Sequence, residues 1–358
     1  MKKILCITDA FTLGGAERQL IGLASFLKEE EYEVDLACYY KENFYKDLIA
    51  SCGLNYIELH PKGRLDKIIQ IRNLIKNNKY DCVIAYKDGP TLITSILKVL
   101  RMKPKLIVSE RNTSQRLTIH SKIKFELYRF ADYIVPNSFS QEKFIINNFP
   151  NLVGKLHTIT NFTDVDFFSF NKKSKNTNLD ILIAGRIAQQ KNILRFLDAV
   201  NIIKENKLPF HFKWIGNVST GEQEYEALVY DKLHSLQLED IIEFHPATNS
   251  IRDEYQSCDA FCLPSLYEGY PNVICEAMSC GCPILCSRVC DNPFIVEDES
   301  NGFLFDPLDV QSIVRAFHKF LSLKMEERMD MSERNRCISV ERFSKKNFVQ
   351  KYIDLIES

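Results

Sequence analysis

Residues 265–283, SLYEGYPNVICEAMSCGCP, place two glutamates, Glu268 and Glu276, eight positions apart across a Gly-Tyr-Pro-Asn step. The preceding run DAFCLPS is typical of a strand, so Glu268 lies on the following loop and Glu276 about one turn inside the next helix. An ionised carboxylate accepts two hydrogen bonds at once, which suits the hydroxyl groups of a sugar. The alternative, dipole compensation at a helix start, explains Glu276 fairly well but Glu268 poorly.

A second segment, AGRIAQQKN at 184–192, offers positive charge at the end of another predicted strand. The strand ends at Gly185, and Arg186 and Lys191 then flank the start of a helix near Asn192. Two cations beside exposed helix-start N–H groups form a site suited to a diphosphate. The alternative interpretation is a solvated basic loop.

A third segment contains the pair Gly14 and Gly15, between the first predicted strand and the first predicted helix. Glycines at such a turn allow the backbone to approach a ligand closely. The same pair also occurs where a turn needs a positive φ for purely structural reasons. The glycine pair alone is therefore a weak signal.

The elements around these segments predict a doubly wound α/β fold, because short apolar strands alternate with helices along most of the chain. The chain has 358 residues, which favours two domains. Ligands bind beyond the carboxyl ends of the strands in such folds, and two Rossmann-like domains in series predict a cleft between them. The predicted parts are a Rossmann-like domain at 1–168, a linker at 169–180, a second Rossmann-like domain at 181–340, and a C-terminal helix at 341–358 that packs back on the first domain.

Charge and cysteine content limit the function classes. Residues 1–175 hold 27 Lys and Arg against 19 Asp and Glu, whereas the remainder holds 19 against 28. A basic half favours an anionic partner, although solvated helix faces would give the same count. The twelve cysteines lack the Cys-x-x-Cys pairs of a metal site near 280–290, so we expect buried reduced thiols. We find no signal peptide and no apolar run long enough to span a membrane.

The motifs GRIAQQKN and PSLYEGYPNVICEAMSCGCP together resemble the signatures of the retaining glycosyltransferases of family 4, which have the GT-B fold. GGAERQ, NSFS and NFTDVDFF fit the same family, and the resemblance covers essentially the whole chain. It implies that Arg186 and Lys191 neutralise the donor diphosphate in place of a metal ion, that Glu268 contacts the donor sugar, and that Glu276 holds the ribose. It further implies donor contacts from Gly14, Gly15, Gly185, Gly269, Tyr270, Pro271 and Asn272.

The chain also departs from the family pattern at two places. Cys290 and Asp291 stand where the family has glycines, which weakens the carry-over of the contact at that loop. A histidine is common in the acceptor domain of the family, whereas the segment VSERNTS here offers Glu110 and Arg111 at a strand end. We take these two as acceptor-side residues, with a surface ion pair as the alternative.

The resemblance is strongest to bacterial enzymes of surface-polysaccharide and lipid-linked oligosaccharide synthesis. It implies a UDP-linked hexose or N-acetylhexosamine donor, a saccharide acceptor on polyprenyl diphosphate, and no cofactor or metal. We expect a cytoplasmic protein, with peripheral contact to an anionic membrane through basic amphipathic helices such as RLDKIIQIRNLIK, and no nucleic-acid partner. Packing of these helices on the sheet is the alternative explanation for their apolar residues.

The competing functions are a nucleotide-sugar epimerase and a non-catalytic donor-binding subunit. A dehydrogenase is disfavoured because no G-x-G-x-x-G follows the first strand.

Overall fold

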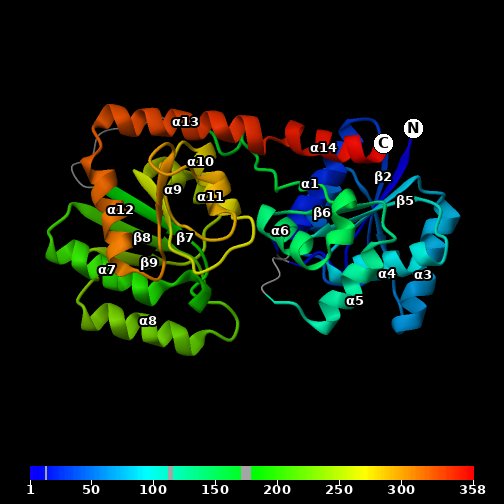
Figure 1. Cartoon of the computed structure of the whole chain (residues 1–358), viewed down its shortest axis with the longest axis horizontal. Helices are drawn as coiled ribbons and strands as arrows, with labels where there is room; N and C mark the ends of the chain where they lie inside the picture. Colours follow the sequence, from blue (N-terminus) through cyan, green and yellow to red (C-terminus); the bar gives the residue numbers. More distant parts are fainter. Residues whose placement is uncertain (13, 112–115, 171–178) are drawn as a thin grey trace. The chain divides into compact units, whose positions relative to one another are not determined.

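The computed structural model describes residues 1–12, 14–111, 116–170 and 179–358, and the chain divides into two compact units. The first unit comprises Met1–Phe162 together with Lys345–Ser358, and the second comprises Thr163–Ser344. Each unit is built on a six-stranded parallel sheet with helices on both faces (Figure 1). The predicted fold of two Rossmann-like domains is therefore confirmed.

The first unit has the strand order β3-β2-β1-β4-β5-β6. Helices α3, α4 and α5 pack on one face of this sheet, and α1 and α14 pack on the other. The strands are β1 Lys3–Ile7, β2 Glu33–Cys38, β3 Asn55–Glu58, β4 Cys82–Tyr86, β5 Lys105–Glu110 and β6 Tyr133–Pro136. The helices are α1 Gly15–Glu29, α2 Lys46–Ser51, α3 Arg64–Asn78, α4 Asp88–Val99, α5 Ile119–Tyr128, α6 Phe139–Asn148, the 3₁₀ helix η1 Pro150–Lys155, and α14 Lys345–Glu357.

The second unit has the strand order β12-β11-β10-β7-β8-β9. Helices α7, α8 and α12 pack on one face of the sheet, and α9, α10 and α13 pack on the other (Figure 1). The strands are β7 Leu179–Ala184, β8 Phe210–Ile215, β9 Ile242–His245, β10 Ala260–Leu263, β11 Ile284–Ser287 and β12 Gly302–Phe305. The helices are η2 Gln189–Lys191, α7 Ile193–Glu205, α8 Gln223–Ser235, α9 Ile251–Ser257, α10 Asn272–Ser279, α11 Asn292–Ile295, α12 Val310–Ser322 and α13 Met325–Phe343.

The central strands form because continuous apolar runs can be buried on both faces of a parallel sheet. All five residues of β4, CVIAY, are buried, and so are all four of β10, AFCL. Eleven of the twelve cysteines are fully or partly buried, Cys337 on α13 is exposed, and all twelve are free thiols. None of the helices in the described ranges is both long enough and apolar enough to cross a bilayer.

The unit boundaries differ from the predicted domain boundaries of 168, 181 and 341. The N–H of Thr163 donates to the carbonyl of Phe343, and Phe168 packs on Tyr255, so residues 163–168 belong to the second unit. Most of the predicted linker at 169–180 lies outside the described residues, but its last two residues already form the start of β7. The chain is extended at Ser344, which separates α13 from α14, so the predicted single helix at 341–358 is two helices.

Candidate functional site

The loops that follow β7 and β10 meet at the carboxyl edge of the second sheet, because these two strands are neighbours in it. The N–H of Leu266 donates to the carbonyl of Gln190 at 2.8 Å, and the amide of Gln190 donates to the carbonyl of Tyr267 at 2.8 Å. Asn192 adds a hydrogen bond of 3.1 Å to the carbonyl of Pro264. The two motifs are thus joined although about 75 positions separate them in the sequence.

Lys191 and Glu268 form an ion pair at this edge, with 2.7 Å between Nζ and Oε1. Both side chains are nearly buried. Lys191 crosses over Gly185, where a Cβ atom would lie 3.0 Å from its Cε. The absence of a side chain at Gly185 therefore makes room for Lys191, a local reason for glycine that the sequence did not reveal.

Arg186 differs from Lys191 because it is exposed and directly follows Gly185. In the described part of the chain, no ion pair or hydrogen bond joins its side chain to another residue. A guanidinium in this state can bind two oxygens of a phosphate through its planar fork of N–H groups. The edge thus combines one available cation with one that is already paired.

Gly216, after β8, is a site residue that the sequence analysis missed. A Cβ atom there would lie 2.1 Å from the carbonyl oxygen of Gly185, so the two loops touch through their backbones. The indole N–H of Trp214 donates to the same carbonyl at 2.8 Å. The signal was present in the sequence as a glycine directly after the strand FHFKWI, where a close backbone approach is one reason for glycine.

The loop of Glu268 continues through Gly269 into a buried turn. Tyr270 is buried and lies edge-on to Phe343, with 6.4 Å between the ring centroids. Pro271 is the N-cap residue of α10, and Asn272 is its first residue, as predicted from the sequence. This packing fixes the direction in which the backbone of the loop faces.

Glu276 is buried inside α10, one turn after Asn272, where the spacing predicts it. The hydroxyl of Tyr255 donates to its Oε2 at 3.4 Å. The two glutamates therefore have different protein partners, Lys191 for Glu268 and Tyr255 for Glu276. Only the tertiary structure makes this distinction.

Cys290 also contacts the Glu268 loop. Its φ is 46°, in the left-handed region that favours glycine, and glycine is what the family pattern has there. Burial raises the pKa of the Cys290 thiol, while a hydrogen bond to the backbone of Glu268 opposes that shift. The departure from the family pattern thus places a neutral thiol against the loop that carries Glu268.

The carboxyl edge of the first sheet holds a second group of charges. Lys87, directly after β4, lies 3.0 Å from Asp9, which follows β1, and also bonds to Glu17. Thr12 donates to the same Glu17 at 2.8 Å. Burial lowers the pKa of Lys87, but its hydrogen bonds to Glu17 and Asp9 outweigh this effect and raise the pKa overall. Lys87 therefore stays charged.

Gly14 leaves room for this arrangement, because a Cβ atom there would lie 2.5 Å from Oε2 of Glu17 and the carboxylate would have to shift. Gly15 is the first residue of α1. The sequence analysis named the two glycines but missed Asp9, Glu17 and Lys87. Their signal was their position, since Asp9 and Lys87 come shortly after apolar strands and Glu17 lies in the first turn of the helix.

Glu110 and Arg111, predicted as acceptor-side residues, have separate partners and do not form the surface ion pair that was the alternative. Glu110 is 2% exposed and accepts from Lys124 at 2.7 Å and from the hydroxyl of Tyr128. Burial raises the pKa of Glu110, and the charge of Lys124 opposes this shift. The buried carboxylate of Glu110 is thus already bonded to Lys124 and Tyr128. Its direct contact with an acceptor stays a prediction.

Arg111 ties the end of β5 to the C-terminal helix. Its guanidinium donates to Asn161 at 3.0 Å and to the hydroxyl of Tyr352 at 2.7 Å. It also lies 4.0 Å from the ring centroid of Tyr86. The bond to Tyr352 adds to the apolar packing that holds α14 on the first unit. The acceptor role of Arg111 stays a prediction.

Several known proteins resemble this chain over much or all of its length. Residues 164–337 match the family model described as glycosyl transferases group 1. An uncharacterised glycosyltransferase of Haemophilus influenzae is 26% identical over 95% of this chain and 96% of its own length. A Campylobacter jejuni enzyme is 28% identical over 85% and 84%, respectively, and its name is GalNAc-α-(1→4)-GalNAc-α-(1→3)-diNAcBac-PP-undecaprenol α-1,4-N-acetyl-D-galactosaminyltransferase. The crystal structure of Anabaena HepE in complex with UDP has the same fold, with a TM-score of 0.87, 17% identity and full coverage of both chains.

Proposed function

From the match of residues 164–337 to the glycosyl transferases group 1 model, we propose that the chain is a member of this family. We further propose that it transfers a hexose or N-acetylhexosamine from a UDP-sugar to a saccharide on a polyprenyl diphosphate. The Campylobacter relative supports the acceptor class, because its name specifies an undecaprenol-diphosphate saccharide. The UDP complex of HepE supports the nucleotide. The route to which such a product belongs is bacterial polysaccharide or oligosaccharide synthesis.

The observation that carries the proposal is the available guanidinium of Arg186 beside the Lys191–Glu268 pair at the carboxyl ends of β7 and β10. As the bond between C1 of the sugar and the diphosphate breaks, negative charge grows on the leaving oxygen. Cations fixed at that point stabilise the transition state more than the ground state. They also supply the charge that a metal ion would otherwise supply, so we propose transfer without metal.

Glu268 has the complementary task. Its carboxylate holds Lys191 in place and keeps further acceptor capacity for the hydroxyls of the donor sugar. The bond from C1 to the acceptor oxygen then forms while the acceptor hydroxyl gives its proton to the leaving diphosphate oxygen. We propose that the anomeric configuration is retained, since the Campylobacter relative makes an α-linkage and the usual UDP-hexoses are α-anomers.

The test is transfer by the purified chain with UDP-glucose, UDP-galactose and their N-acetylated forms, on undecaprenyl-diphosphate saccharides, with EDTA or with Mg²⁺. We expect one donor to give a product one sugar longer, at equal rates in both buffers, with an α-linkage by NMR. Interconversion of donors without an acceptor would instead identify an epimerase.

Binding of UDP is a separate readout, because a ligand at 100 times its Kd adds about 2.7 kcal/mol to the stability of its protein. We expect a thermal shift with UDP that is independent of metal, is reduced in Glu276→Ala and is largely kept in Arg186→Ala. Arg315→Ala is the matched control, since Arg315 is an exposed arginine that pairs with Asp309 at the start of α12. UDP binding without transfer on any acceptor would favour the non-catalytic donor-binding subunit.

A further inference from the structure

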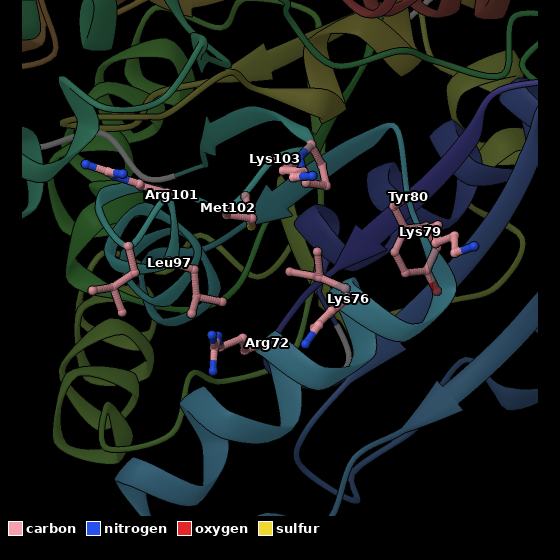
Figure 2. A pocket seen from close by; sticks show the side chains of 11 residues that line it. Arg72, Lys76, Lys79, Tyr80, Leu97, Arg101, Met102 and Lys103 are labelled. Carbon is pink, nitrogen blue, oxygen red and sulfur yellow. The ribbon is translucent and has the colours of Figure 1, made fainter.

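A pocket of about 510 Å³ lies in the first unit, between the C-terminal ends of α3 and α4 (Figure 2). Five cationic side chains surround it, namely Arg72, Lys76, Lys79, Arg101 and Lys103. Its floor is apolar and includes side chains of both helices and of the segments that precede β4 and β5. The pocket therefore combines positive charge at its rim with an apolar floor.

The charge of this pocket is not balanced by the protein. None of the five cations forms an ion pair or a side-chain hydrogen bond with another residue in the described ranges. Residues 67–80 and 89–109 each contain four Lys or Arg and no Asp or Glu. Like charges held together without counter-charges repel one another, so this surface attracts an anion.

Compensation of helix dipoles explains only part of this pattern. Lys76 lies in the last turn of α3, and Lys79 is its C-cap residue, so both interact favourably with that end of the helix. Arg72 lies six residues before the end of α3, and Lys103 lies four residues beyond the end of α4. The dipole effect is confined to the last turn, and it gives no reason for an apolar floor.

Exposed apolar side chains continue from the pocket onto the surface. Leu100 lines the pocket and is 64% exposed, and its neighbour Val99 is also exposed. On α3, Ile69 is 54% exposed and lies one turn before Arg72, which lines the pocket, whereas the exposed Leu65 lies a further turn away, near the start of the helix. A free phosphate in solution gains nothing from such side chains, whereas a lipid surface offers both phosphate groups and an apolar interior.

We propose that the pocket and the exposed apolar side chains beside it dock the first unit on an anionic membrane, with lipid phosphates bound by the cations at its rim. The pocket lies at the amino edge of the sheet, because Tyr80 precedes β4 and Pro104 precedes β5. Lys87 and Arg111 follow the carboxyl ends of the same strands, about 17 Å away for a five-residue strand. Docking therefore leaves the carboxyl edge free. The docking proposal rests on the proposed function in one respect only, the reason why this protein would act at a membrane.

The experiment measures sedimentation of the whole chain with vesicles of phosphatidylcholine alone or of phosphatidylcholine with about 30% phosphatidylglycerol. The anionic lipid gives the vesicles a negative surface potential, which attracts basic segments. We expect binding only to the anionic vesicles, and its loss at high salt. The variant Arg72→Ser/Lys76→Ser/Lys79→Ser should bind roughly 100-fold more weakly, because each cation near the surface contributes about a five-fold gain in affinity. The control is Lys143→Ser/Lys207→Ser/Lys346→Ser, which removes three exposed lysines from other surfaces and should bind like the wild type to within a few-fold.

Equal binding of the two triple variants would overturn the proposal, because the loss would then follow total charge and not this pocket. The proposal would also be overturned if the protein did not bind vesicles but gave a thermal shift with inorganic phosphate or pyrophosphate. The occupant of the pocket would then be a soluble anion. A second variant, Leu100→Asn/Met102→Gln, keeps every charge and should still lose about ten-fold in vesicle binding. Vesicle binding is measured without any sugar transfer, so failure of the proposed function leaves this result unaffected.

Discussion

The two units share a fold but treat the charges at their carboxyl edges differently. In the second unit, Arg186 is exposed and has no protein partner among the described residues, and Lys191 is paired only with Glu268. In the first unit, Lys87 is enclosed by Asp9 and Glu17, and Lys124 by Asp88 and Glu110. One edge keeps positive charge for a ligand, and the other neutralises it.

This difference shows how one architecture can support two tasks. Arg186 has no protein partner to lose among the described residues, and the ammonium of Lys191 keeps two further N–H donors beyond its bond to Glu268, so both can bind a diphosphate. Lys87 and Lys124 each lie between two carboxylates, which they would first have to give up. The paired groups of the first unit are instead suited to hold loops in one conformation. Gly14 and Glu17 illustrate this, since the glycine leaves room for the carboxylate that holds Lys87.

The largest effect is expected where the comparison is sharpest, at Arg186 and Lys191. Either change to alanine should lower kcat by about 100- to 1,000-fold, because the charge of the leaving diphosphate develops in the transition state. Affinity for UDP should change much less. The measurement is kcat with UDP affinity determined separately by calorimetry, and Arg315→Ala serves as the control. Equal loss of UDP affinity with intact turnover at saturation would contradict the assignment.

The second-largest effect is expected at Glu276, which should contribute to UDP binding and not to turnover. Glu276→Ala should weaken UDP binding about 10- to 100-fold, since hydrogen bonds to a charged group contribute roughly 1.5–3 kcal/mol. Calorimetry with UDP measures this change. Glu299→Ala, on the surface and paired with Lys319, should leave the affinity unchanged. A loss of kcat with unaltered affinity would reverse the roles given to Glu276 and Arg186.

A smaller effect, on stability, is expected from the backbone contact that supports the second edge. Gly216→Ala should lower the unfolding free energy by about 1–3 kcal/mol, because its Cβ would overlap the carbonyl of Gly185 at 2.1 Å. Urea unfolding measures the change. At Gly154 a Cβ would meet nothing within 4 Å, so Gly154→Ala is the control and should be nearly neutral. Similar stability of the two variants would show that the loops after β7 and β8 can separate.

The smallest effect is a pH dependence in the first unit. The raised pKa of Lys87 contributes stability that is complete below the ordinary lysine value of 10.5 and is lost as the pH rises through the folded-state value. Lys87→Arg keeps its charge in that range. The wild type should therefore lose stability relative to Lys87→Arg above pH 10.5, as measured by urea unfolding between pH 8 and 11.5. A difference that stays constant over this range would show that Lys87 is not stabilised by Asp9 and Glu17.

Sequence patterns predicted the central strands and only two of the four edge strands, β6 and β9. The central strands are continuous apolar runs, whereas the edge strands β3 and β12 have only four residues each and were not predicted. Short edge elements depend on pairing with a neighbour in space, and local sequence carries little information about that pairing.

The sequence by itself determined the two-unit α/β fold and the positions of Arg186, Lys191, Glu268 and Glu276. The reason is that apolar strands must be buried in parallel sheets, and residues that follow such strands then gather at one edge. Only the tertiary structure decided the partners, Lys191 with Glu268, Tyr255 with Glu276, and Lys87 with Asp9 and Glu17. Partners are set by which strands become neighbours and by which glycines leave room, and neither can be read from spacing along the chain.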